Sequence, residues 1–167
     1  MTKPLVVDIP TDQAFLAQYA RASIAHAQLD NALKMFVRSF DESSVEDALK
    51  YIGYTGAAKL RKRIVELATA RFGKGEALDM VLQFMSHCED ISDRRNYLLH
   101  SPIARERDGP EFRMRSRGTN EWVALPPADE LKALAEETFA LQQDMNHQRL
   151  SGLIDAALRQ YRSNPKE

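Results

Sequence analysis

The sequence of 167 residues is poor in features that cross-link a chain or anchor it in a membrane. It has one cysteine, Cys88, which excludes an internal disulfide and a zinc site built from several thiolates. It has no run of about 18 apolar residues, so no transmembrane helix is predicted. The first ten residues also lack the apolar stretch of a signal peptide. We therefore expect a soluble, cytoplasmic protein with no membrane partner.

Charge is balanced over the chain as a whole. The 23 basic and 24 acidic side chains give a net charge of −1, so total charge neither requires nor excludes a nucleic-acid partner. Hydrophobic residues make up 44% of the sequence and charged residues 28%. This composition excludes a wholly disordered chain, and the length predicts a single domain over residues 1–167.

Apolar residues recur at steps of three and four over long segments, which is the spacing of one helix face. The series in residues 11–40 predicts a long first helix with Thr11 as its N-cap. A second series predicts a helix over residues 76–100. That helix is expected to end there because Pro102 disfavours helical backbone at the residue before it.

Residues 103–125 instead alternate with period two, which predicts a β-ribbon of two or three short strands. Turn signals separate these strands at Asp108-Gly109 and Gly118-Thr119-Asn120. A final helical region is predicted over residues 129–162, and Gly152 either divides it or lies within one helix. The predicted fold class is all-α: a bundle of four to five helices, with the ribbon inserted before the last helical region.

The four histidines are the first candidates for chemistry. His26 lies on the apolar face of the first helix, which predicts a packed residue, and His87 and His147 are interpreted as polar surface residues. His100 differs because it falls at the C-terminal end of the helix predicted over residues 76–100. The partial negative charge of a helix C-terminus favours an imidazolium there.

Two residues shortly before His100 converge on it. Asn96 and His100 are four residues apart and share a helix face, and Arg95 is long enough to reach the same spot. A histidine beside a guanidinium suits a phosphate group or a leaving oxygen. The alternative is a solvated helix end, in which Arg95 pairs with an acid and His100 caps carbonyls.

This segment resembles the signature of the HEPN (higher eukaryotes and prokaryotes nucleotide-binding) family. That signature is an arginine, often followed by a polar residue, then a histidine after four to six residues, at the end of a long helix in a helical bundle. The resemblance covers Arg95, Asn96 and His100 and the helical framework. It implies a metal-independent endoribonuclease with no cofactor, in which two chains pair as a homodimer and form a composite site.

In that picture His100 is the general acid or base, Arg95 stabilises charge on the scissile phosphate, and Asn96 orients His100 or a phosphate oxygen. The resemblance also implies RNA or a nucleotide as ligand, a toxin–antitoxin or phage-defence setting, and a cognate inhibitor protein. A second pair, Arg21 and His26, has the same separation, but Ala22 follows the arginine and the pair lies in the middle of a helix.

A second hypothesis is a catalytically inactive HEPN-like scaffold, or a homodimer that binds RNA or a nucleotide without cleaving it. Many family members have lost activity. Some subfamilies carry a tyrosine after the histidine, and this sequence has Ser101-Pro102 there.

Arginines are concentrated around and after this motif. Residues 94–117 hold seven arginines and three acidic residues. We predict that an arginine-lined ribbon holds an RNA backbone. Equally compatible alternatives are an edge ribbon whose charges prevent aggregation and pairing with the acidic last helical region. A contact surface for a protein partner is a third, less favoured alternative. The predicted nucleic-acid-binding residues are Arg94, Arg105, Arg107, Arg113, Arg115 and Arg117.

Overall fold

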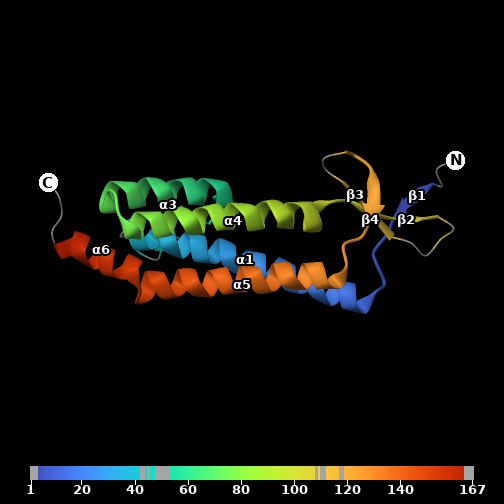
Figure 1. The fold of residues 1–167 in the computed structure, drawn as a ribbon. Coiled ribbons are helices and arrows are strands. Elements are labelled where there is room, and N and C mark those ends of the chain that lie inside the picture. Colours follow the sequence, from blue (N-terminus) through green and yellow to red (C-terminus); the bar gives the residue numbers. More distant parts are fainter. Residues whose placement is uncertain are drawn as a thin grey trace. The chain divides into compact units, whose positions relative to one another are not determined.

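The computed structural model describes residues 4–41, 44, 46–47, 53–107, 109, 112–116 and 119–163. It is mostly helical and has a small four-stranded antiparallel sheet (Figure 1). At this level the predicted all-α class with a small β insertion is confirmed. Within the described ranges, none of the helices combines the length and apolar character that crossing a membrane demands.

The chain forms two compact units. Unit 1 comprises Met1–His26 and Ile91–Thr138, and unit 2 comprises Ala27–Asp90 and Phe139–Glu167. The helices α1 (Gln13–Asp41), α4 (Glu76–His100) and α5 (Ala128–Leu150) contribute residues to both units. The other elements are α3 (Ala57–Phe72), α6 (Leu153–Ser163), β1 (Leu5–Val7), β2 (Ile103–Glu106), β3 (Phe112–Arg115) and β4 (Trp122–Ala124). The single domain over residues 1–167 stays a prediction.

The start of α1 differs by one residue from the prediction. Asp12 Oδ1 accepts hydrogen bonds from the backbone N–H groups of Ala14 at 2.8 Å and Phe15 at 3.2 Å. Asp12 is therefore the N-cap, and the prediction of Thr11 was wrong. A carboxylate adds a favourable charge at the positive end of the helix dipole, which a threonine hydroxyl cannot supply.

The sheet belongs to unit 1 and has the strand order β1-β2-β3-β4. The three strands of the predicted ribbon are present, and β1 pairs with β2 as a fourth strand, a pairing that the sequence did not predict. A three-residue strand has too little alternation to be recognised without its partner. Asp108, Arg117 and Gly118 lie outside the described residues.

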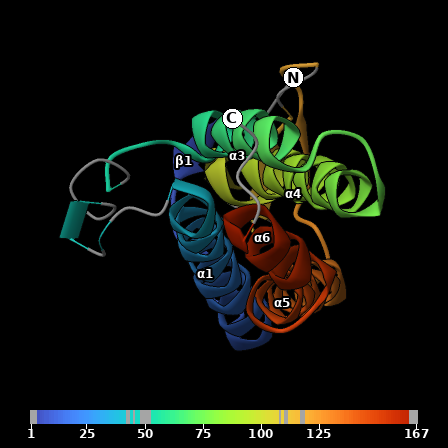
Figure 2. The same cartoon turned by 90° about the vertical axis from the view of Figure 1, so that its left-hand side faces the viewer.

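The core of unit 2 is built from large apolar side chains. Phe36 and Phe40 of α1 are fully buried. Phe36 meets Phe84 of α4 edge to face, with ring centroids 6.3 Å apart, and Phe40 lies against Phe72 of α3 at 5.5 Å. Helix α6 packs against α3 (Figure 2). The ring contacts join α1, α3 and α4 around one aromatic cluster, and α6 is attached through α3.

The last helical region is divided at the position the sequence left open. Helix α5 ends at Leu150 and α6 begins at Leu153. The backbone N–H groups of Ser151 and Gly152 both donate to the His147 carbonyl, and the Gln148 side-chain oxygen accepts from the Leu153 N–H at 2.9 Å. The side chain of Gln148 thus lies across the junction, where only a glycine leaves room for it.

Replacing Gly152 with alanine is expected to lower the free energy of unfolding by about 1–3 kcal/mol. A Cβ at this position would lie 2.8 Å from the Gln148 Cα and would overlap the Gln148 side-chain oxygen. Gly56→Ala is the control, because a Cβ there meets no atom within 4 Å and φ is an ordinary −68°. Urea unfolding followed by circular dichroism measures both variants. Equal stability of the two would contradict the close packing at Gly152.

Candidate functional site

Three predicted site residues lie together at the C-terminal end of α4, within unit 1. Arg95 Nη1 lies 3.0 Å from the Asn96 side-chain oxygen and 2.6 Å from His100 Nε2. His100 is exposed, whereas Arg95 and Asn96 are half-buried. One guanidinium nitrogen therefore contacts both partners, and the group presents its charge beside an imidazole that solvent reaches.

The contact between Arg95 and His100 engages one nitrogen of the imidazole ring. A guanidinium has only N–H donors, so His100 Nε2 is the acceptor in this contact. The Nε2 lone pair therefore points at the guanidinium in this arrangement and becomes available to another proton donor only when the contact opens.

The end of α4 is held by side chains that cap its last carbonyl groups. The Tyr19 hydroxyl of α1 donates to the Leu99 carbonyl at 2.6 Å, and the Ser101 hydroxyl donates to the Tyr97 carbonyl at 2.7 Å. Leu98 and Leu99 are buried. These hydrogen bonds and the buried leucines hold the backbone next to His100 in place. Sequence reasoning missed Tyr19, which is separated from Leu99 by 80 positions and has no local signal.

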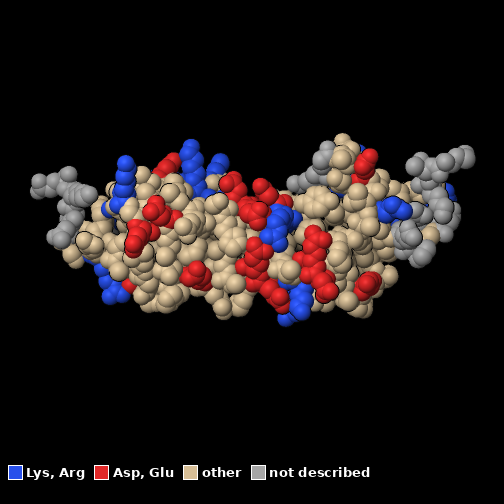
Figure 3. Space-filling model, viewed as in Figure 1, with Lys and Arg blue, Asp and Glu red and all other residues tan. Residues whose placement is uncertain are grey.

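Arg94 forms an ion pair with a carboxylate of the same chain. Its Nη1 lies 2.6 Å from Glu137 Oε2 of α5, and both side chains are partly exposed. Acidic side chains follow α5 on the face of the molecule seen in Figure 3. Among the arginine roles that the sequence left open, this contact corresponds to pairing with the acidic last helical region.

The arginines of the sheet do not share one face. Cross-strand partners lie on the same face of a sheet, and Arg105 pairs with Phe112, so the neighbouring Arg113 lies on the opposite face. Arg113 and Arg115 share that opposite face, and Trp122 lies opposite Arg115. The ribbon therefore offers a surface with two of the predicted arginines.

The other predicted arginines are distributed elsewhere. Arg105 Nε donates to the Asp8 carboxylate at 2.9 Å, and this hydrogen bond holds the pKa of Asp8 below its usual range. Arg107 is exposed just after β2, and its backbone N–H donates to the Pro4 carbonyl. Arg117 lies outside the described residues.

Replacing Arg113 and Arg115 together with alanine is expected to weaken RNA binding and to flatten its salt dependence by roughly 0.7 per lost phosphate contact. Arg105→Ala is the control, because that guanidinium is on the other face and already bound to Asp8. Fluorescence anisotropy at several salt concentrations measures the slope. If the slope is unchanged in the double variant, this face does not contact the RNA backbone.

The second pair with the same spacing has a different environment. His26 is 5% exposed within the apolar side of α1, as predicted for a packed residue, whereas Arg21 is exposed. Cys88 is fully buried, its sulfur lies 3.7 Å from that of Met145, and burial raises the pKa of the thiol to about 12. Neither His26 nor Cys88 is therefore accessible as a nucleophile or a base.

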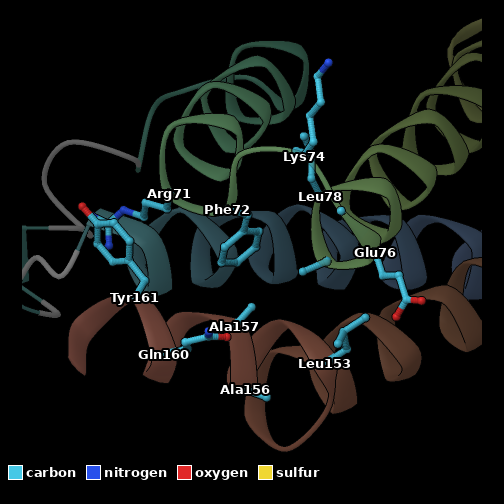
Figure 4. Close-up of a pocket in the computed structure, with 12 residues that line it drawn as sticks. Arg71, Phe72, Lys74, Glu76, Leu78, Leu153, Ala156, Ala157, Gln160 and Tyr161 are labelled. Atoms are coloured by element: carbon cyan, nitrogen blue, oxygen red, sulfur yellow. The ribbon is translucent and has the colours of Figure 1, made fainter. Parts of the chain in front are cut away.

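Unit 2 contains a separate cavity of about 500 Å³ where the turn between α3 and α4 meets α6 (Figure 4). Phe72 and Leu153 line it, and the Arg71 guanidinium lies over the Tyr161 ring at 5.1 Å. No residue of the Arg95 site lines this cavity. In the described part of the chain, no three His, Cys, Asp or Glu side chains are grouped as a metal site would require.

Comparison with known proteins found no matching family model, no matching curated sequence and no matching solved structure. Function is therefore inferred from the chemistry of the Arg95 site and from the motif that Arg95, Asn96 and His100 form.

Proposed function

We propose that the protein is a metal-independent endoribonuclease that acts as a homodimer through a composite arginine–histidine site. The observation that carries the proposal is the contact of Arg95 Nη1 with His100 Nε2 at 2.6 Å, at an exposed helix end. A general base beside a fixed cation is the minimal equipment for transferring a proton at a phosphate ester.

The proposed reaction uses the ribose itself as the nucleophile. The 2′-oxygen attacks the adjacent phosphorus and loses its proton to an imidazole nitrogen. The bond from phosphorus to the 5′-oxygen breaks, and that oxygen receives a proton. The products are a 2′,3′-cyclic phosphate and a free 5′-hydroxyl, so atoms and electrons balance without water or an oxidant.

Two copies of the site suit this geometry. In an in-line displacement the attacking 2′-oxygen and the leaving 5′-oxygen lie on opposite sides of phosphorus. One imidazole cannot easily serve both sides at the same moment. A homodimer supplies one unprotonated His100 as the base and a second, protonated His100 as the acid.

Arg95 and Asn96 act on the phosphate and on the imidazole. The Arg95 guanidinium stabilises the extra negative charge that develops on the phosphate oxygens in the transition state. The Asn96 side-chain oxygen accepts from Arg95 at 3.0 Å and thereby orients the guanidinium. The biological setting we propose is a cytoplasmic toxin or phage-defence effector controlled by a cognate inhibitor.

A cleavage assay tests the proposal directly. Purified protein is incubated with RNA in EDTA, and the products are resolved on a denaturing gel and tested for cyclic phosphate ends. We expect cleavage to persist in EDTA, and sedimentation equilibrium to give a dimer. A pure preparation that leaves several structured and unstructured RNAs intact would contradict the nuclease function.

The second candidate is a homodimer that binds RNA or a nucleotide without cleaving it. The observation that favours it is that the contact to Arg95 occupies the very lone pair that a base needs. If this contact stays closed when RNA binds, Arg95 and His100 recognise a phosphate and do no chemistry. Saturable RNA binding with no product in the same reaction identifies this candidate.

A further inference from the structure

A second group of arginines converges in unit 2, away from the motif. Arg149 of α5 and Arg162 of α6 both contact Ser39 of α1, and Arg38 precedes Ser39 in the chain. Arg149 Nη1 is 3.5 Å from the Ser39 hydroxyl oxygen, and Arg162 Nη2 donates to the Ser39 carbonyl at 3.2 Å. Arg149 and Arg162 are 110 and 123 residues from Ser39 in the sequence, so long-range packing brings these two guanidinium groups together.

Among the residues that the structure describes, positive charge is in excess here. Arg38 and Arg149 form no ion pair with any residue that the structure describes. Burial, and then the charge of Arg38, lower the pKa of Arg149. Two like charges held together while half-buried raise the energy of the site until an anion compensates them.

The two neighbouring carboxylates that the structure describes are already engaged. Asp155 is ion-paired with Arg159 on the same helix, and Asp41 binds Arg63 at 3.1 Å. The charge of Arg162 also acts on Asp155, so this carboxylate offsets part of the cluster. Within the described ranges, it leaves Arg38 and Arg149 without an ion pair.

We propose that Arg38, Arg149 and Arg162 form a binding site for a phosphate group. A tetrahedral phosphate accepts several hydrogen bonds at once, and guanidinium groups arriving from three helices match that demand. Arg149 is already oriented, because its Nη2 donates to the Asn146 side-chain oxygen at 3.3 Å. Its Nε is buried and has no hydrogen-bond partner in the described part of the chain.

This site does not rest on the proposed nuclease function, because its residues belong to unit 2 and the motif belongs to unit 1. The ligand chemistry is a phosphate oxyanion. Its source is either the phosphodiester backbone of RNA or a small free phosphate compound, and the two are separated by the choice of probe.

The first measurement uses pyrophosphate as the probe. The melting temperature of the full chain is followed during a titration of pyrophosphate at ionic strength held constant with potassium chloride. We expect a saturable rise for the wild-type protein and a loss of about tenfold in apparent affinity for Arg149→Gln. Arg38→Gln should behave in the same way, and it is informative even if Arg149→Gln folds poorly, because Arg38 makes no hydrogen bond within the described part of the chain.

Lys62→Gln is the matched control. It also removes one positive charge from unit 2, but its side chain is 81% exposed on α3 and lies 4.0 Å from Glu66. We expect a response equal to that of the wild type. If pyrophosphate stabilises the control and the arginine variants equally, the phosphate binds elsewhere and the proposal is overturned.

The second measurement uses a fluorescent 2′-O-methyl oligonucleotide, which lacks the hydroxyl that the proposed cleavage needs. Binding that Arg149→Gln weakens identifies an RNA backbone as the ligand. A pyrophosphate response without oligonucleotide binding identifies a small phosphate compound, and it leaves the site intact. A wild-type protein that responds to neither probe would rule the site out.

Discussion

Replacing His100 with alanine is expected to lower kcat for RNA cleavage by about 10²–10⁴-fold, the usual cost of losing a general acid or base. The fold should not change, because His100 is exposed and its backbone is held by the Tyr19 and Ser101 contacts around Leu99. The measurement is the single-turnover rate of cleavage of a labelled RNA in EDTA, expressed per folded molecule.

Two other histidines provide controls for this prediction. His147→Ala removes an exposed histidine from the last turn of another helix, α5, and should leave the rate unchanged. His26→Gln alters a buried residue, so activity should fall only as the fraction of folded protein falls. If His26→Gln inactivates fully folded protein while His100→Ala stays active, the assignment of the active site to Arg95 and His100 is wrong.

Local features allowed much of the helical framework to be predicted. Helix α4 has the predicted bounds at both ends. Apolar periodicity indicates the helix and Pro102 indicates its end, and both are signals carried by neighbouring residues. The ribbon was also found, since alternation and turn residues are local signals. The place of β1 in the sheet was missed because it depends on pairing with β2, almost 100 residues away.

The candidate site also has a part that the sequence predicts and a part that it does not. Arg95, Asn96 and His100 lie within six residues on one helix, so helical geometry alone predicted their convergence. The sheet arginines needed the register between β2 and β3, which separates Arg105 from Arg113 and which the sequence does not contain.

The cluster around Ser39 had no signal in the sequence at all. Its arginines come from three helices, and neither their spacing nor their neighbours mark them as a group. Long-range packing brings Arg149 and Arg162 to Ser39, so only the structure could reveal the excess of positive charge among the described residues there.

The second large effect is expected at Arg95. Arg95→Ala should lower kcat by about 10²–10³-fold, the typical cost of removing one donor that stabilises charge in the transition state. Arg95→Lys should recover little of this loss, although it keeps the positive charge. A planar guanidinium can hold Asn96 and His100 with Nη1 and direct its other N–H groups to a phosphate, whereas an ammonium is a point charge on a flexible stem.

Asn96→Ala separates orientation from charge. It removes the acceptor at 3.0 Å from Arg95 and should cost about tenfold, the value of a hydrogen bond to a charged group. In an Arg95→Ala background the same change should cost almost nothing, because no guanidinium is left to orient. Single-turnover rates of the four proteins form the double-mutant cycle. Additive losses would mean that Asn96 acts on the RNA independently of Arg95. Full activity in Arg95→Lys would contradict the role of the guanidinium shape, because it would mean that the reaction requires only the positive charge.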